Sequence, residues 1–127
     1  MSSATQVRSL IERWCKAFVA SDVDCLVGMY ASDAVFLGTT SPRMLSTTDE
    51  IREYFVRATR QRNPKSADVL ELQLQDHGAL VVANALDRIE WSDSQGPLVS
   101  MGRVTFILGR FDHGWRIESF HRSEAPR

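Results

Sequence analysis

Hydrophobic residues recur at helical spacing in the first part of the chain and at alternate positions in the second part. Near the N-terminus, apolar residues repeat every three or four positions, which predicts an amphipathic helix. This stripe consists of Val7, Leu10, Ile11, Trp14, Cys15, Phe18 and Val19. Ser21 followed by Asp22 is typical of a helix N-cap, so a short second helix is expected to follow.

A short apolar run and then a capping signal follow the second predicted helix. Residues 34–37 are apolar and too few for a helix, and the polar segment 38–42 stops them, so they predict a strand. Thr47 and Glu50 have the spacing of a capping box, in which each side chain binds the backbone N–H of the other residue. A third helix is therefore expected from this box to about Arg62.

After Pro64 the hydrophobic period changes from that of a helix to that of a strand. The predicted strands cover residues 69–75, 80–91, 98–111 and 115–122, separated by turns rich in Asp, Gly, Ser and Pro. Helices followed by long strands predict an α+β domain, in which three N-terminal helices pack on a strongly curved mixed or antiparallel sheet that encloses a cone-shaped pocket. No repeat or linker divides the chain, so residues 1–127 are interpreted as one domain.

Charge and cysteine content narrow the possible partners. The chain has 15 Lys and Arg residues against 16 Asp and Glu residues, so we expect no nucleic-acid or membrane partner. No apolar run approaches the roughly 20 residues that cross a bilayer, and no signal peptide precedes the first helix, so a cytoplasmic location is predicted. Cys15 and Cys25 match no metal or redox spacing, so we expect buried free thiols, with no metal and no cofactor.

Several local motifs agree with those of one known family. They are Trp14 in the first helix, residues 30–36 at the first strand, residues 49–55 in the third helix, and the terminal Gly114-Trp115 with His121 and Ser123. In these motifs and in the order of its elements, nearly the whole chain resembles the nuclear transport factor 2-like superfamily, and in particular its small bacterial SnoaL-like members. The ending Phe120-His121-Arg122-Ser123 also resembles that of the calcium/calmodulin-dependent protein kinase II association domain, which forms rings. The resemblance implies a small-molecule pocket and a homodimer through the sheet or a larger ring.

The resemblance also bears on catalysis. Ketosteroid-isomerase-like members of the superfamily place a general-base aspartate at a position that falls here near Gly38, so isomerase catalysis of that type is not expected. Epoxide hydrolases of this fold need an Arg–Asp pair, but Asp87 and Arg88 are adjacent, and adjacent strand residues face opposite ways. Whether the chain catalyses any reaction stays open.

Three polar residues on the last two predicted strands are candidate site residues. Arg103 alternates with apolar residues, so it is either an anion anchor or a buried ion-pair partner. His121 has the parity of Trp115 and Ile117, which predicts that it faces the cavity as a core side chain or as a catalytic proton-exchanging group. Strict alternation puts Arg122 on the other face, whereas the resemblance to the association domain makes it a pocket residue. We favour the pocket, which requires a β-bulge or the end of regular strand pairing.

Aromatic side chains and further arginines complete the set of candidates. Each aromatic residue is either a wall for a planar ligand or an ordinary core residue. The aromatic candidates are Trp14, Tyr30, Phe36, Tyr54 and Trp91. Arg43 is expected either at the cone mouth or as a solvated loop charge, and the resemblance puts a pocket arginine near Arg88. The basic residues at the end of the third helix, Arg57, Arg60, Arg62 and Lys65, suit the helix dipole and need no anionic partner.

Two classes of function remain open. In the first, the protein binds or converts a small apolar, aromatic or anionic molecule, whose carboxylate or oxyanion is held by Arg103 or Arg122. In the second, it is an association module without catalysis. An apolar outer sheet face would favour the second class, and we expect such a face to contain Leu98, Val104, Phe106 and Leu108.

Overall fold

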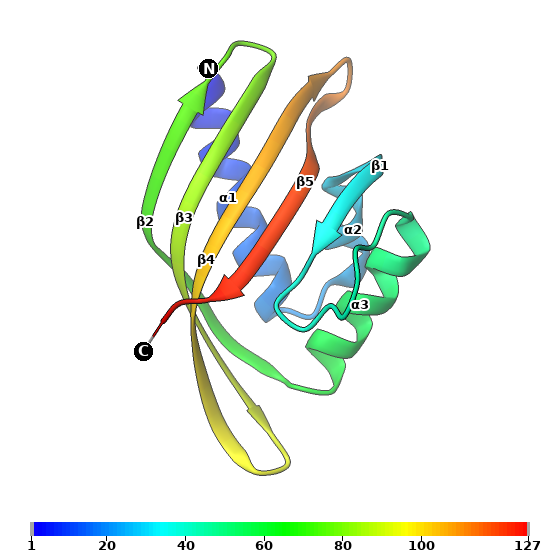
Figure 1. Cartoon of the computed structure of the whole chain (residues 1–127), viewed down its shortest axis with the longest axis vertical. Helices are drawn as coiled ribbons and strands as arrows, with labels where there is room; N and C mark the ends of the chain where they lie inside the picture. Colours follow the sequence, from blue (N-terminus) through cyan, green and yellow to red (C-terminus); the bar gives the residue numbers. More distant parts are fainter. Residues whose placement is uncertain (1, 127) are drawn as a thin grey trace.

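Three helices and five strands form the described part of the chain, residues 2–126 of the computed structural model (Figure 1). They are α1 (Ser3–Val19), α2 (Val23–Gly28), β1 (Tyr30–Leu37), α3 (Thr48–Arg60), β2 (Pro64–Asp76), β3 (Leu80–Asp93), β4 (Gly96–Phe111) and β5 (Gly114–Glu124). The strands form one sheet in the order β1-β5-β4-β3-β2. Only the β1–β5 pair is parallel within this sheet, so the sheet is mixed and the predicted α+β class is confirmed.

Local signals in the sequence explain where the elements begin. The predicted capping box is present: the Glu50 N–H donates to Thr47 Oγ1 at 3.1 Å, and the Thr47 N–H donates to Glu50 Oε1 at 3.2 Å. Helix α3 ends at Arg60, slightly before the predicted end. Strand β2 begins at Pro64 rather than at residue 69, because a proline is tolerated at the first position of a strand.

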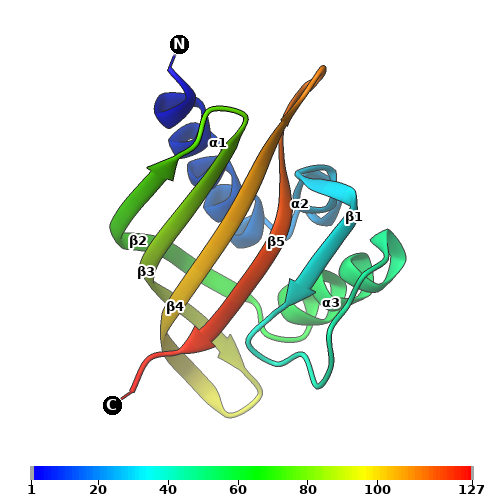
Figure 2. The ribbon, with the colours of Figure 1, turned by 45° about the horizontal axis from the view of Figure 1, so that its top comes forward.

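The helices cover one face of the sheet, which curves around α1 (Figures 1 and 2). Strand β4 pairs with β3 so that Val104 lies opposite Ala85 and Phe106 lies opposite Ala83, and all four side chains are buried. Leu108 is buried on the same inner face. The prediction that Val104, Phe106 and Leu108 form an outer apolar face is therefore wrong. The outer face of β4 consists of the alternate residues, which include the exposed Val99 and Met101; Leu98 is also exposed.

A β-bulge in β5 changes the direction of the side chains at the C-terminal end of this strand. Ile107 pairs with Ser119 and Leu108 pairs with Ile117, so Glu118 is the extra residue without a partner on β4. Beyond Glu118 the alternation is shifted by one position. Arg122 is consequently buried on the inner face, whereas His121 is exposed on the outer face. The prediction that His121 shares the inner face with Ile117 is wrong, because strict alternation does not account for the bulge.

Candidate functional site

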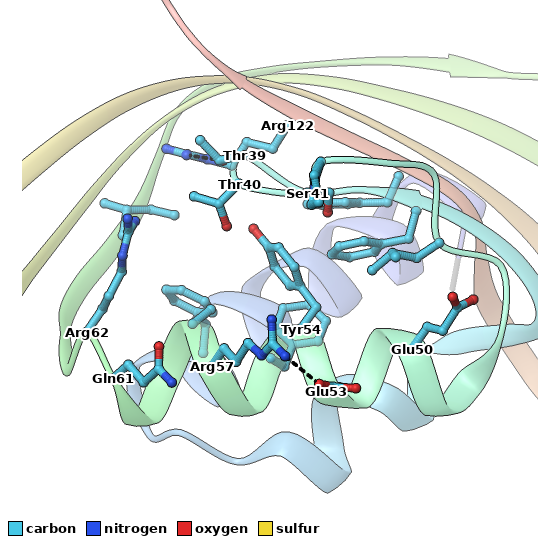
Figure 3. A pocket seen from close by; sticks show the side chains of 18 of the residues that line it. Thr39, Thr40, Ser41, Glu50, Glu53, Tyr54, Arg57, Gln61, Arg62 and Arg122 are labelled. Atoms are coloured by element: carbon cyan, nitrogen blue, oxygen red, sulfur yellow. Dashed lines mark hydrogen bonds and ion pairs between the residues drawn. The ribbon is translucent and has the colours of Figure 1, made fainter.

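A cavity of about 390 Å³ lies between α1, α3, the loop from β1 to α3, and the inner face of the sheet (Figure 3). Its buried wall is aromatic, and its exposed mouth carries polar and charged side chains. The aromatic wall includes Trp14, Phe18, Phe36, Phe55 and Phe120. Pockets of a few hundred cubic ångströms with apolar walls and a few polar groups are typical of small-molecule sites.

The aromatic wall is tightly packed. The Trp14 ring stacks on Phe18 and on Phe120, with centroid separations of 5.4 and 5.7 Å, and Phe36 stacks on Phe120 at 4.9 Å. Such ring pairs each contribute about 0.5–1.5 kcal/mol beyond the burial of their area. Trp14 Nε1 donates to the hydroxyl of Tyr30 at 3.1 Å. Tyr30 is buried behind this wall and does not line the cavity, so its placement disagrees with the predicted ligand contact.

Tyr54 fills the space next to Gly38. It projects from α3 into the cavity, with its hydroxyl toward the loop that carries Thr40 and Ser41 (Figure 3). A Cβ atom added at Gly38 would overlap the Tyr54 ring. A side chain at position 38 is therefore incompatible with Tyr54 in this position.

Arg122 is the centre of a buried polar network on the sheet side of the cavity. Its Nε donates to Asp87 Oδ2 at 3.0 Å, and its Nη2 donates to Asp87 Oδ1 at 2.7 Å. Nη1 donates to the hydroxyls of Thr39 and Ser100, at 2.8 and 3.2 Å, and Nη2 also donates to the Ser100 carbonyl at 3.3 Å. Ser100 in turn donates to Glu124 at 3.1 Å.

This network uses all the hydrogen-bonding capacity of the guanidinium. An arginine has five N–H donors, and each of those of Arg122 has an acceptor. Arg122 lines the cavity as the resemblance to the association domain implied, but it is committed to Asp87. The inward ion pair is thus Asp87–Arg122, whereas the adjacent Arg88 faces the other side of the sheet.

Two exposed ion pairs border the mouth of the cavity. Arg43 pairs with Glu50, and Arg57 pairs with Glu53 one helical turn away on α3. The N–H of Ser46, followed by the side chain of Arg43, lowers the pKa of Glu50 to about 2. Arg43 therefore lies at the mouth, where it holds the start of α3 against the loop that precedes it.

Arg62 and Trp91 form a different kind of contact at the mouth. The Arg62 guanidinium carbon lies over the Trp91 ring, 5.3 Å from its centroid, and both residues line the cavity. The Trp91 ring is buried, and its Nε1 has no hydrogen-bond partner among residues 2–126. The sequence pattern indicated Trp91 as an aromatic candidate but Arg62 only as a charge at a helix end. The contact depends on the chain reversal at Asn63, which the sequence does not reveal.

Three of the predicted site residues lie on the opposite face of the sheet. Arg103 and His121 border a hollow of about 350 Å³ on the outer face. Arg88 also points outward and pairs with Glu90 at 3.3 Å. None of these three lines the aromatic cavity. The sequence did not suggest Asp87 as a site residue, although a signal for it was present. Strand alternation puts Asp87 on the same inward face as the buried Ala85, and a buried carboxylate needs a cationic partner.

The described residues contain no candidate metal centre. Within residues 2–126, no group of three or more His, Cys, Asp or Glu side chains is arranged to hold an ion. Cys15 and Cys25 are unpaired; Cys15 is half-buried, and Cys25 is exposed rather than buried as expected. Burial, and then the Asp87 carboxylate, raise the pKa of Cys15 to about 11, so its thiol stays protonated near neutral pH. None of the described helices is long and apolar enough to cross a bilayer.

Comparison of the sequence with known families identifies the class of protein that this fold and cavity define. Residues 7–127 match the profile of the SnoaL-like domain. The chain therefore belongs to the SnoaL-like family, whose fold is that of nuclear transport factor 2-like proteins. No protein of curated function matches the chain.

Solved structures agree with this fold over nearly the whole chain. A candidate calcium/calmodulin-dependent protein kinase II association domain from Xanthomonas campestris is 22% identical, with a TM-score of 0.88 over 100% of this chain and 91% of that chain. A ketosteroid isomerase-like protein from Erwinia carotovora atroseptica is 14% identical, with a TM-score of 0.83 over 97% and 96%. A candidate aromatic ring hydroxylase from Novosphingobium aromaticivorans is 17% identical, with a TM-score of 0.87 over 97% and 89%.

Proposed function

We propose that this protein binds one small molecule with an apolar, planar body inside its cone. The observation that carries the proposal is the cavity of about 390 Å³, whose buried aromatic wall includes Trp14, Phe18, Phe36, Phe55 and Phe120. Aromatic walls bury much apolar area and accept flat molecules by stacking. The likeness to an isomerase-like protein and to a candidate ring hydroxylase also supports a flat apolar ligand. Residues 1–127 would act as one domain, in the cytoplasm.

The proposed activity is binding rather than isomerase-type proton transfer. A general base needs a free carboxylate or imidazole within reach of the ligand. Both carboxylates of the described lining, Glu50 and Glu53, are paired with arginines, and the described lining contains no histidine. His121, the catalytic candidate of the sequence analysis, lies on the outer face.

A neutral fluorescent probe tests whether the cavity is the binding site. We expect N-phenyl-1-naphthylamine, an uncharged dye that brightens in apolar surroundings, to bind the wild type with a stoichiometry of one. Ala58 lines the cavity from α3, so Ala58→Trp fills the cavity and should abolish the fluorescence increase. Ala79→Trp, in the exposed turn between β2 and β3, adds the same side chain away from the cavity and should leave binding unchanged. Undiminished binding by a folded Ala58→Trp variant would refute the proposal.

Self-association through the outer sheet face is a second candidate function, compatible with the first. Leu86, Val99 and Met101 lie on the outer face, and each is 42–44% exposed. Exposed apolar side chains that cluster on one face are typical of an interface. The likeness to the candidate association domain from Xanthomonas campestris also supports a homodimer or a larger ring.

The oligomer mass tests this second candidate. We expect a dimer or larger species for the wild type and a monomer for Met101→Glu, because a charge would be buried at the interface without a partner. Met44→Glu is the matched control, since Met44 is also exposed but lies in the loop before α3. The measurement is multi-angle light scattering after size exclusion. A wild type that is monomeric at high concentration would exclude this candidate.

A further inference from the structure

The charges that line the cavity are balanced, with one exception. Four arginines line it, and three of them are paired with a carboxylate. The pairs are Arg43–Glu50, Arg57–Glu53 and Arg122–Asp87. The fourth is Arg62. Within residues 2–126, no carboxylate pairs with Arg62, and no acceptor receives a hydrogen bond from its guanidinium.

Arg62 is nevertheless held in place on both its backbone and its side chain. The Ser92 N–H donates to the Arg62 carbonyl at 3.1 Å, which ties the residue to β3. The next residue, Asn63, has a left-handed backbone with φ of 46°, which fixes the reversal between α3 and β2. The guanidinium rests over the Trp91 ring, a contact that leaves its N–H donors free to bind an anion.

The helix dipole does not account for this arrangement. Arg57 and Arg60 are the basic residues of the last turn of α3, and the C-cap is Gln61. Arg62 lies beyond the cap, and the dipole effect falls off within the last turn. Its side chain lies at the cavity, where Figure 3 shows it on the α3 side, across from Arg122.

We propose that Arg62, positioned by Trp91, binds the carboxylate of an aromatic monocarboxylic acid whose ring system fills the cavity. This inference rests on the proposed small-molecule function and names its ligand class. A guanidinium matches a carboxylate with two parallel N–H···O bonds. The aromatic wall provides no partner for a second charge, and the other three arginines of the lining are already paired with carboxylates, so the ligand carries a single carboxylate.

A matched pair of probes tests the charge preference. Binding of 2-naphthoate and of its uncharged analogue 2-naphthamide is measured by isothermal titration calorimetry. We expect wild type to prefer the naphthoate by about tenfold to a hundredfold, the range for hydrogen bonds to a charged group. Arg62→Gln should abolish this preference, because it lowers the naphthoate affinity more than the naphthamide affinity. Arg60→Gln is the control, because it removes the same charge two residues earlier, at an exposed site at the end of α3 and outside the cavity.

The outcomes separate this inference from the proposed function. If N-phenyl-1-naphthylamine binds in the cavity but the protein does not prefer naphthoate to naphthamide, the proposed role of Arg62 is wrong, and the proposed binding function of the cavity stands. The same conclusion follows if the preference survives Arg62→Gln. If neither the dye nor either naphthalene compound binds, both proposals are overturned.

Trp91 acts as a positioning residue for Arg62, which a second pair of variants tests. Trp91→Leu should lower the naphthoate preference by about threefold to tenfold, because the cation–π contact is lost. Trp91→Phe should restore part of the preference, since it keeps an aromatic face and breaks no hydrogen bond that the described part of the chain makes to Trp91 Nε1. The ratio of the two affinities is the readout, because a general loss of packing would lower both affinities together. An unchanged ratio in Trp91→Leu would show that Trp91 does not position Arg62.

Discussion

The two sides of the cavity use an arginine in opposite ways. On the sheet side, Arg122 is buried, and Asp87, Thr39 and Ser100 accept all its hydrogen bonds. On the α3 side, Arg62 is half-buried and rests on Trp91 with no described acceptor. A buried charge without its partner is costly, so the first arrangement contributes to the integrity of the fold. The second leaves donors for a ligand. Arginines at the same cavity can thus be structural or functional, and their partners distinguish them.

The largest expected effect comes from removing the partner of Arg122. Asp87→Ala leaves the guanidinium buried and uncompensated, so we expect the free energy of unfolding to fall by about 3–5 kcal/mol. Urea denaturation followed by tryptophan fluorescence measures this change. Replacing both partners, Asp87→Leu with Arg122→Met, should recover most of the loss, because apolar residues of similar size often replace a buried ion pair without penalty. A loss below about 1 kcal/mol in Asp87→Ala would show that water replaces the Asp87 carboxylate as the hydrogen-bond partner of Arg122.

A substitution that crowds the Arg122 guanidinium should lower the free energy of unfolding by an intermediate amount. A Cβ atom at Gly102 would lie 2.5 Å from the Nε, Cζ and Nη2 atoms of Arg122. Gly102→Ala therefore forces the network to shift, and we expect a loss of about 1–3 kcal/mol in the free energy of unfolding. Gly28→Ala is the control, because a Cβ atom there meets nothing within 4 Å. Equal stability of the two variants in urea would mean that the network adapts freely.

The fold could be predicted from the sequence because the signals that indicate its helices, strands and turns lie within short segments. The capping box of Thr47 and Glu50, the turns between the strands and the change of hydrophobic period after Pro64 depend on short segments, and each appears in the structure. The faces of the last two strands were harder to predict. The bulge at Glu118 shifts the alternation by one residue, and an extra residue has no signature in a single sequence.

The site was predicted only in part, for a related reason. Trp14, Arg43, Tyr54, Trp91 and Arg122 line the cavity, as the aromatic pattern and the family resemblance indicated. The sequence does not reveal which carboxylate pairs with which arginine, since Asp87 and Arg122 come from strands far apart in the chain. Arg62 is a functional candidate because three other arginines are paired, and only the three-dimensional structure shows these pairs.

A smaller loss of stability is expected from Thr39, which lies at the edge of the Arg122 hydrogen-bond network. Thr39 Oγ1 accepts a hydrogen bond from Arg122 at 2.8 Å, and Thr39→Val keeps the shape of the side chain but removes the acceptor. We expect a loss of about 1 kcal/mol in the free energy of unfolding, since Thr39 is half-buried and water can replace it. Thr40→Val, at the exposed neighbouring position, should change urea stability by less than about 0.5 kcal/mol. A larger effect at Thr40 than at Thr39 would contradict the assigned hydrogen bond.

The smallest effect on stability should come from Arg62. Arg62→Gln removes a cation–π contact at a partly exposed site, so we expect a loss of at most about 1 kcal/mol. The same substitution at the buried position, Arg122→Gln, leaves Asp87 without its cation and should cost about 3–5 kcal/mol. Urea denaturation of both variants under one buffer measures the difference. If Arg62→Gln is as destabilising as Arg122→Gln, Arg62 is a structural residue, and the contrast between the two sides of the cavity fails.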